Sequence, residues 1–552
     1  MPKMTGARCI AEIFKGYDVT HVFFMQSMLK TALIEMGKLN IHRILAHSEK
    51  SAAYMADGYA RASHKPGICL AQSVGAANLA AGLQDAYLGL SPVIALTGQR
   101  APLPKLRHAY QEIEHAPLFE PVTKFNAAVD RVEDLPFFLR QAFREATAGP
   151  PAPVHLDLQG GNTGKKLAEA EADLDVTAEK QFSRYPAFRP EPEMERIREA
   201  VRMLGQSLRP VIVAGGGVTA SQAGKDVVEL AEKLSIPVVT SLNGKGTILE
   251  NHSLSVGVVG SYSRWCANRV VSEADLVLFI GSHTGSQVTN EWRIPRIGTL
   301  VIQIDIDPLE LGSSYPAKVA LLGDARTTVR RLIEAVEPVK PAMDWLQRVH
   351  QLVSEWRHEA ETMLNSDASP IRPERICKEL TEFLPSDGLV VSCTGHSGVW
   401  TGTMLDLTQP GQSYLRAAGS LGWAFPAALG VKCAVPERPV ICFTGDGGLW
   451  YHIAELETAI RHGINIVTVV NNNHSLNQVT WDMVDKSEAG EIWQFSDVNL
   501  ATLAETMGCF GIQVRKPSEL KGALQAAFAS GKPAVVDVVS DIDAMPLSPW
   551  AP

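Results

Sequence analysis

Two polar segments with the residue types of a metal and phosphate site follow apolar strands in the last third of the chain. These segments are Gly445-Asp446-Gly447-Gly448, after a strand predicted over Val440–Thr444, and Asn471-Asn472-Asn473-His474-Ser475, after the next predicted strand. Asp446 and Asn473 are 27 residues apart (473 − 446 = 27), the length of one helix plus one strand. Because ligands of open α/β sheets bind at the carboxyl ends of neighbouring strands, we expect the two side chains to converge.

These residue types suit the binding of Mg²⁺ together with a diphosphate. Mg²⁺ takes about six oxygen ligands and obtains several from phosphates, so Asp446, Asn473 and the main-chain carbonyl of Ser475 would supply the protein's share. Gly447 and Gly448 would let the backbone approach a phosphate at a helix N-terminus. Taken alone, Gly-Asp-Gly is typical of a turn, and asparagines often cap helices. The pairing of two adjacent strand ends favours the metal site.

A carboxyl group that could transfer protons stands early in the chain. Glu49 lies where a strand predicted over Ile41–Ala46 is followed by a helix predicted over Glu49–Ala62. A glutamate at a helix start is usually a capping or dipole-favoured residue, so its type alone does not decide its role. His115 is a second candidate acid or base, but a histidine with no known partner is weak support for such a role.

Three blocks of alternating strands and helices must position these residues. The alternation predicts an α/β protein with three open parallel sheets flanked by helices, in domains over 1–165, 190–335 and 365–552. Lys165–Lys180 and the proline-rich Tyr185–Glu193 are predicted to be a linker, and a polar helix around Trp345–Leu364 a second connection. The predicted strands are His21–Phe24, Ile41–Ala46, Gly67–Ala71, Pro92–Thr97 and Val154–Leu158, then Pro210–Ala214, Ile236–Thr240, Leu276–Ile280 and Val301–Asp305, then Gly388–Ser392, Val440–Thr444, Ile466–Asn471 and Ala534–Val539.

Composition excludes several classes of protein. The 552 residues are 45% hydrophobic, which is enough for several buried cores, and the 51 basic and 60 acidic residues are mixed along the chain. This balance argues against a nucleic-acid or membrane-surface partner, and no run approaches the ~18 apolar residues of a membrane span. The eight scattered cysteines lack zinc-site spacing and are predicted to be reduced and mostly buried. We expect a cytoplasmic enzyme.

The motifs resemble those of a known family. The succession of GDGG (445–448), ELETA (455–459) and VVNNNHS (469–475) resembles the cofactor motif of thiamine diphosphate enzymes of the acetolactate synthase, pyruvate decarboxylase and oxalyl-coenzyme A decarboxylase type. The resemblance implies the thiamine diphosphate-binding fold for the first and third blocks and a Rossmann-like middle domain. It implies that Asp446, Asn473 and the Ser475 carbonyl bind Mg²⁺. It also implies that Glu49, nine residues before Gly58 (58 − 49 = 9), binds N1′ of the aminopyrimidine ring.

Further cofactor contacts follow from the same resemblance. Gly419–Ala428 resembles the family's GLGxMGxxLPAA segment, which puts Leu421 where an apolar residue bends the cofactor, although a leucine is equally ordinary core. Thr394–Ser397 resembles the diphosphate-side loop, with Cys393 where aspartate is usual. His108–His115 resembles the FQExD loop. The implied cofactor-binding residues are Asn78, Gly395, His396, Ser397, Gly419, Leu421, Asp446, Gly447, Gly448, Asn473 and Ser475, and the implied catalytic residues are Glu49, Gln111, Ser27 and Met28.

Two segments depart from the family pattern. Where acetolactate synthase-like proteins have VFGxPGG after the first strand, this chain has VFFMQSM at 22–28, so Gln26, Ser27 and Met28 would line the substrate pocket. Met28 would equally fill a core. In the middle block GSHTGSQ at 281–287 replaces GARFDDR, which removes the arginines that face the flavin. FAD or another nucleotide in the middle domain is therefore left open by the glycines at 215–217 but not expected.

The leading hypothesis is a thiamine diphosphate- and Mg²⁺-dependent carbon–carbon lyase or carboligase acting on a small 2-oxo acid such as pyruvate, similar to acetolactate synthase. A 2-hydroxyacyl-coenzyme A lyase or another 2-oxo acid decarboxylase is the alternative within the class. A catalytically inactive cofactor-binding homologue is the alternative outside it. By the resemblance, the cofactor lies between the first block of one subunit and the third block of another, so we expect a homodimer or homotetramer with its active site at the subunit interface.

Overall fold

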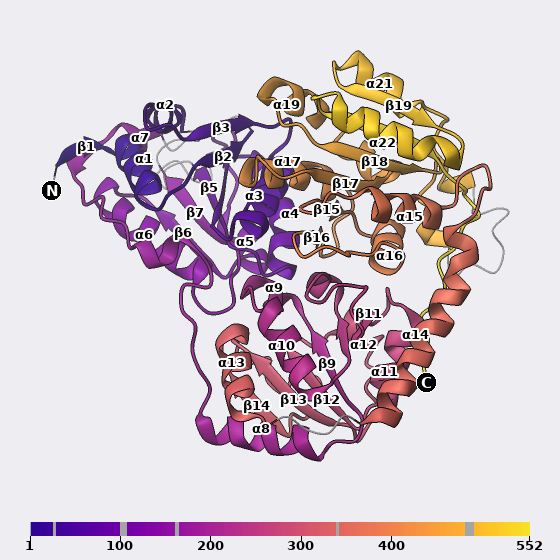
Figure 1. Cartoon of the computed structure of the whole chain (residues 1–552). Coiled ribbons are helices and arrows are strands. Elements are labelled where there is room, and N and C mark those ends of the chain that lie inside the picture. Colours follow the sequence, from indigo (N-terminus) through magenta and orange to yellow (C-terminus); the bar gives the residue numbers. More distant parts are fainter. Residues whose placement is uncertain (1, 26–28, 100–106, 160–164, 338–341, 481–490) are drawn as a thin grey trace.

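The N-terminal part of the chain forms a parallel six-stranded sheet in the order β3-β2-β4-β5-β7-β6. A computed structural model describes residues 2–25, 29–99, 107–159, 165–337, 342–480 and 491–552 (Figure 1). The strands are β2 (His21–Phe24), β3 (His42–Leu45), β4 (Gly67–Gln72), β5 (Val93–Gln99), β6 (Phe125–Val129) and β7 (Val154–Gln159). The helices are α1 (Gly6–Gly16), α2 (Lys30–Lys38), α3 (Glu49–Ser63), α4 (Gly75–Leu88), α5 (Ala116–Phe119), α6 (Leu135–Thr147) and α7 (Lys165–Glu169).

The middle part forms a second parallel sheet with a different strand order, β11-β10-β9-β12-β13-β14. The chain moves outward from β9 in one direction and then from β12 in the other, which is the Rossmann order, with its switch point between these two strands. The strands are β9 (Pro210–Ala214), β10 (Val238–Thr240), β11 (Ser255–Val258), β12 (Leu276–Ile280), β13 (Leu300–Asp305) and β14 (Val319–Leu322). The helices are α8 (Met194–Gln206), α9 (Gly216–Ala220), α10 (Gly224–Leu234), α11 (Trp265–Glu273), α12 (Ser286–Thr289), α13 (Ala325–Ala335) and α14 (Met343–Leu364).

The C-terminal part forms a third parallel sheet, ordered β16-β15-β17-β18-β20-β19. Numbered within its own domain, this order is 2-1-3-4-6-5, the same as in the N-terminal sheet. The strands are β15 (Leu389–Ser392), β16 (Ser413–Arg416), β17 (Val440–Gly445), β18 (Val467–Asn472), β19 (Phe510–Val514) and β20 (Ala534–Val539). The helices are α15 (Pro373–Phe383), α16 (His396–Thr403), α17 (Ala424–Ala434), α18 (Asp446–Trp450), α19 (Glu455–His462), α21 (Leu500–Thr506) and α22 (Leu520–Ala529). The predicted fold class is confirmed.

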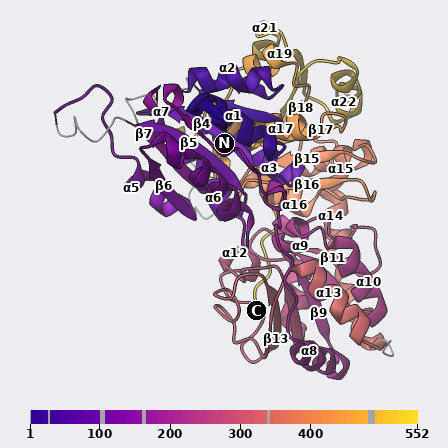
Figure 2. The same ribbon diagram turned by 90° about the vertical axis from the view of Figure 1, so that its left-hand side faces the viewer.

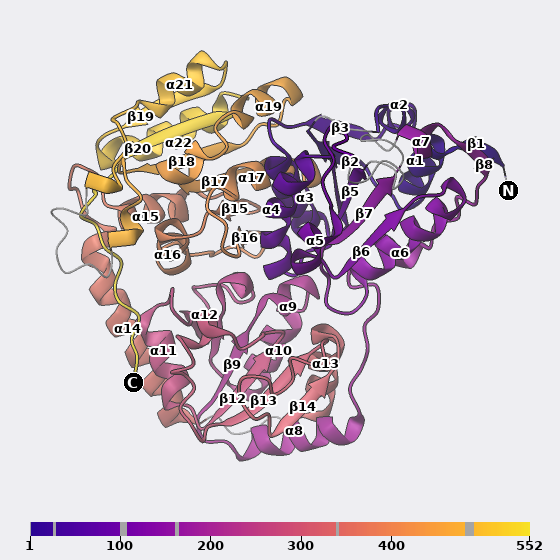
Figure 3. The ribbon, with the colours of Figure 1, turned by 180° about the vertical axis from the view of Figure 1, so that it is seen from behind.

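The N-terminal and C-terminal sheets share one apolar core, made by helices that lie between them. Helices α3 and α4 of the first domain pack beside α17 of the third (Figures 1 and 3). The backbones approach so closely that a Cβ on Gly58 would lie 2.1 Å from the carbonyl oxygen of Ala427, and one on Gly430 would lie 1.9 Å from that of Met55. Only glycine fits at either position. The middle domain lies below this pair (Figure 2).

Two connections differ from what the sequence predicts. The stretch Lys165–Lys180 is not an unstructured linker: it contains α7 and the strand β8 (Glu171–Asp173), which pairs antiparallel with β1 (Lys3–Thr5). Helix α14 is more than a polar connection, because it buries one apolar side against the middle domain. Its buried residues are Trp345, Val349, Leu352, Trp356 and Ala360.

All eight cysteines are free, and all but the half-buried Cys433 are buried, as predicted. Among the described residues, no helix is both long enough and apolar enough to cross a membrane.

Candidate active site

Asp446 is a buried acid with one carboxyl oxygen that lacks a hydrogen bond. Strand β17 ends at Gly445 and α18 begins at Asp446, which is 2% exposed. Among the described residues its Oδ2 atom has no hydrogen-bond partner, and burial raises the pKa of this carboxyl group to about 7. A cation beside Oδ2 would replace the lost hydration and favour the ionised carboxylate. The donor at this position therefore fits a divalent metal ion.

Asn473 lies beside Asp446 at the end of the neighbouring strand, and Ser475 is hydrogen-bonded to Asn473. Gly445 is in register with Asn471 on the neighbouring strand, and the main-chain N–H of Asn473 interacts with the Asp446 carboxyl group and lowers its pKa. The Asn473 side-chain oxygen accepts the Ser475 N–H at 3.1 Å. Of the other two asparagines, Asn472 is buried and donates to Asp537 Oδ1 at 2.8 Å, which makes it part of the domain core.

Two further segments of the C-terminal domain meet the start of α18. A Cβ on Gly448 would lie 3.8 Å from Leu421 Cδ1 and 3.3 Å from Cys393 Sγ, and one on Gly445 would lie 3.7 Å from Ser397 Oγ. The sulfur of Cys393 accepts the N–H of Gly422 at 3.3 Å. The segments at 393–397, 419–422 and 445–448 thus lie together, although the chain separates them widely.

Two glycines of this region lie close to neighbouring side chains. Gly395 has φ of +67°, and a Cβ there would lie 2.4 Å from Gln478 Oε1. A Cβ on Gly447 would lie 2.5 Å from Leu476 Cδ2. Gly419 differs, because no atom of the described residues lies within 4 Å of its Cβ position. His396 begins α16, directly after Gly395.

A second cluster forms around Glu49 in the N-terminal domain. Glu49 is the first residue of α3, after the N-cap Ser48, and is half-buried. Its Oε2 atom accepts the side-chain N–H of Asn78 at 3.2 Å. A Cβ on Gly75 would lie only 2.4 Å from Glu49 Oε1, so this glycine leaves room for the carboxyl group. Among the described residues, the hydrogen bonds of the Glu49 side chain reach Asn78 alone.

Gln111 lies beside this cluster, at the carboxyl end of β4. The Ser73 hydroxyl donates to the main-chain carbonyl of Gln111, and Gln72 Nε2 is 3.4 Å from Gln111 Oε1. Ser27 and Met28, the other two predicted catalytic residues, lie outside the described residues, as does Gln26. The structure therefore gathers Glu49, Asn78 and Gln111 in one domain and the remaining described site residues in another.

His115 is a buried member of a hydrogen-bond network. Its Nδ1 atom is 2.9 Å from Asp157 Oδ1, and the Thr97 hydroxyl lies within 3.1 Å of His115, Asp157 and His155. Two histidines and an aspartate this close are of the metal-binding type. Because the Thr97 hydroxyl bonds to all three, we assign them to a network that fastens the end of the 108–115 loop to the sheet.

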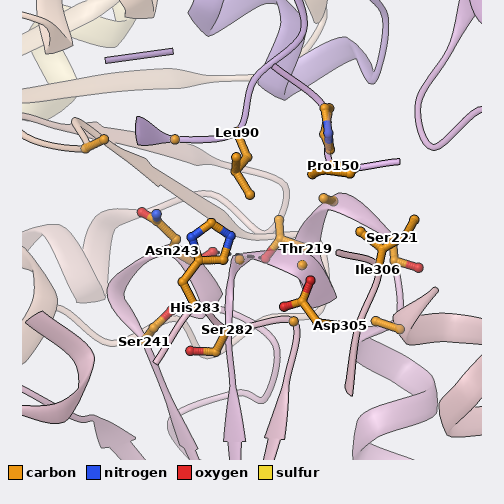
Figure 4. Close-up of a pocket in the computed structure, with 18 of the residues that line it drawn as sticks. Leu90, Pro150, Thr219, Ser221, Ser241, Asn243, Ser282, His283, Asp305 and Ile306 are labelled. Atoms are coloured by element: carbon orange, nitrogen blue, oxygen red, sulfur yellow. Dashed lines mark hydrogen bonds between the residues drawn. The ribbon is translucent and has the colours of Figure 1, made fainter. Parts of the chain in front are cut away.

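The middle domain contains a cavity of about 460 Å³ at the carboxyl edge of its sheet, where it meets the other two domains (Figure 4). Ser241, Asn243, His283 and Asp305 lie around it. The glycines at 215–217 are accounted for by packing, since the Gly217 N–H donates to the Gly281 carbonyl at 2.9 Å and a Cβ on Gly215 would lie 2.1 Å from the same oxygen. The arginines that line the cavity, Arg61 and Arg416, come from the N-terminal and C-terminal domains.

Sequence reasoning missed one acidic cluster, Asp57 and Asp85 with Arg61. Asp85 is fully buried and accepts main-chain N–H groups of the 418–420 segment. The spacing of Asp57 and Arg61, four residues apart on a helix, is a local signal of an ion pair. The contact of Asp85 with the 418–420 segment has no such signal, because the main-chain N–H groups that it accepts are more than 330 residues away in the chain.

A sheet topology that occurs twice, a Rossmann-like middle domain and a buried acid after β17 are the architecture of a three-domain, cofactor-binding α/β protein. Family models agree. The family model described as "Thiamine pyrophosphate enzyme, N-terminal TPP binding domain" matches residues 4–118. The models for the central domain and for the "C-terminal TPP binding domain" of the same enzymes match residues 197–332 and 394–538. The chain belongs to the thiamine pyrophosphate enzyme family.

Individual relatives match over nearly the whole chain. A probable acetolactate synthase large subunit of Methanocaldococcus jannaschii is 34% identical, over 99% of this chain and 94% of the relative. The acetolactate synthase isozyme 3 large subunit of Escherichia coli is 30% identical, over 96% of this chain and 92% of the relative. The acetolactate synthase large subunit of Haemophilus influenzae is 29% identical, over 98% of this chain and 95% of the relative.

Proposed function

We propose that this thiamine pyrophosphate enzyme is a Mg²⁺-dependent carboligase that takes a small 2-oxo acid such as pyruvate as donor, releases CO₂ and joins the remaining fragment to a second carbonyl compound. With pyruvate as both substrates, two pyruvate anions and one proton give one acetolactate anion and one CO₂. The observation that carries the proposal is the 34% identity to a probable acetolactate synthase large subunit over 99% of the chain. The bound cofactor supplies a carbon nucleophile and an electron sink for the carboxylate that leaves.

The residues of the chain would then bind the cofactor and control a proton. The Asp446 carboxylate, the Asn473 side-chain oxygen and the Ser475 carbonyl would hold Mg²⁺ and, through it, the diphosphate, with Gly447, Gly448 and the 395–397 loop around them. Leu421 would press the cofactor into a bent shape. Asn78 orients the Glu49 carboxyl group through the 3.2 Å hydrogen bond, so that Glu49 can share a proton with N1′ of the aminopyrimidine. Gln111, Ser27 and Met28 would line the substrate pocket.

The assembly we propose is a homo-oligomer whose active site spans two subunits. Its support is the separation of the two clusters, since Glu49 and Asp446 lie in different domains.

The domains proposed are 1–165, 190–335 and 365–552, and limited proteolysis at the connections would test these bounds. We propose a cytoplasmic location, where the buried free thiols would stay reduced. Cell fractionation tests this.

The test of the function is an assay of the purified protein with thiamine diphosphate, Mg²⁺ and pyruvate, with measurement of CO₂ and identification of the carbon product. Acetolactate is the expected product. Acetaldehyde would make the protein a decarboxylase instead. Intact pyruvate with the cofactor bound would overturn the substrate assignment, and a 2-hydroxyacyl-coenzyme A thioester and other 2-oxo acids would then be assayed. An inactive homologue would bind the cofactor and turn over none of them.

A further inference from the structure

We propose that Asp85, a residue of the N-terminal domain, is a positioning residue that fixes the cofactor-facing segment 418–421 of the C-terminal domain. This inference rests on the proposed cofactor site. Asp85 lies on α4 and is completely buried. Its Oδ1 atom accepts the N–H of Ala418 at 2.9 Å, and its Oδ2 atom accepts those of Gly419 at 3.0 Å and Ser420 at 2.8 Å. One carboxylate therefore holds three consecutive peptide groups.

These three N–H groups depend on Asp85. The segment lies outside the helices and strands, and within the described part of the chain none of the three N–H groups has a main-chain acceptor. A fourth donor, Arg61 Nη2, reaches Oδ1 at 3.2 Å, so each carboxylate oxygen accepts two hydrogen bonds. An asparagine side chain cannot reproduce this arrangement. It keeps one oxygen and would turn an –NH₂ group toward two of the four donors.

Asp57, the other acid of the cluster, makes different contacts. Asp57 accepts Arg61 Nε at 2.7 Å and Trp423 Nε1 at 2.8 Å, and none of its hydrogen bonds reaches the main chain of the 418–420 segment. Arg61 also donates to the Arg416 carbonyl at 2.8 Å. Asp57 therefore joins the two domains through side chains, whereas Asp85 sets the course of the backbone before Leu421. This difference provides a matched control.

The position of Leu421 follows from the course of the backbone over residues 418–420. The segment is fixed at its beginning by Asp85 and at its end by the hydrogen bond from the Gly422 N–H to Cys393 Sγ. Gly422 has φ of +86°, a conformation that favours glycine. Leu421 stands between these two anchors, with Cδ1 beside the start of α18. Release of the first anchor would free the backbone on one side of Leu421 while the metal-binding residues keep their places.

The experiment compares Asp85→Asn with Asp57→Asn in the full-length protein. Binding of thiamine diphosphate with saturating Mg²⁺ is measured by calorimetry, and kcat at saturating cofactor by pyruvate consumption. For Asp85→Asn we expect about a tenfold or greater increase in cofactor Kd and a comparable fall in kcat. Asp57→Asn should lower the melting temperature and leave kcat at saturating cofactor within about twofold. Equal effects of both variants on Kd and kcat, or no effect of Asp85→Asn, would overturn the proposal.

Hydrogen exchange separates this inference from the proposed function, because it needs neither cofactor nor substrate. In the wild-type protein the amides of Ala418, Gly419 and Ser420 should exchange at least about tenfold more slowly than amides without an acceptor. They should lose this protection in Asp85→Asn and keep it in Asp57→Asn. Fast exchange in the wild type would overturn the inference even if Asp85→Asn does not fold. Protected amides in a protein that binds no thiamine diphosphate would contradict the proposed function and leave the anchor intact.

Discussion

Asn78 and Asp85 lie seven residues apart on α4 (85 − 78 = 7), about two helical turns, and each holds a different half of the candidate site. Asn78, in the first turn, donates to Glu49 in its own domain. Asp85 accepts N–H groups of the C-terminal segment that precedes Leu421. One helix thus connects the proton-transfer residue of the proposed site to the backbone that shapes its cofactor pocket.

The carboxyl group of Glu49 is the first target for mutation. Glu49→Gln keeps the size of the side chain and the contact with Asn78 but removes the proton-sharing group. We expect kcat to fall at least about 100-fold while thiamine diphosphate stays bound, as measured by steady-state assay and calorimetry. His47→Asn is a suitable control, because His47 contacts Glu457 at 2.7 Å instead and should retain activity. Full activity of Glu49→Gln would contradict the proposed role.

Gly75 tests whether the placement of Glu49 matters. A Cβ here would lie 2.4 Å from Glu49 Oε1, so Gly75→Ala should push the carboxyl group aside and lower kcat by about tenfold or more, with little change in far-ultraviolet circular dichroism. Gly205→Ala is the matched helical control. Nothing lies within 4 Å of its Cβ position, so it should raise the free energy of unfolding by about 0.5–1 kcal/mol and leave kcat unchanged. Identical kinetics of the two variants would refute this account.

The buried His452 should make the free energy of unfolding depend on pH. Burial, followed by the charge of Lys50, lowers the pKa of His452 to about 4, and its Nδ1 atom is 2.8 Å from the Ser51 hydroxyl. Between its ordinary pKa of 6.5 and about 4, the unfolded chain binds a proton at this residue and the folded chain does not. The free energy of unfolding should therefore fall as pH decreases through this window, by up to about 1.4 kcal/mol per pH unit from this residue.

Denaturant titrations at several pH values would measure this dependence. His452→Asn should remove the contribution of this residue, so its slope between pH 6.5 and 4 should be smaller than that of the wild type. The exposed His358 on α14 gives a control, since His358→Asn should keep the full slope. If all three proteins show the same slope, His452 does not have the assigned effect.

The sequence predicted those features that a single segment carries. Strands β2, β9, β12 and β20 match their predicted bounds, because each is a mostly apolar run flanked by polar or turn residues. Strand β8, of sequence EAD, is mostly polar and is identified as a strand by its pairing with β1, so composition could not reveal it. The same contrast explains which site residues could be predicted from the sequence. Asp446, Asn473 and Glu49 stand in local motifs, whereas Asp85 acts on peptide groups whose position depends on how two domains pack.

The proposed location of the site between two subunits can be tested by combining two inactive variants. Glu49→Gln and Asp446→Ala should each be inactive, the second because it loses the metal-binding carboxylate and with it Mg²⁺-dependent retention of the cofactor. If one site takes Glu49 from one subunit and Asp446 from another, a mixed dimer contains one site with both changes and one intact site. Co-expression with random pairing should then restore about a quarter of the wild-type activity.

Differently tagged subunits allow the mixed dimer to be isolated before the assay. Two-step affinity purification should give a species with about half of the wild-type activity per dimer, since one of its two sites is intact. Were both residues to act within one subunit, each subunit of the mixed dimer would carry a damaged site. A pure mixed dimer without activity would therefore refute the interface-spanning site and locate the cofactor within a single chain.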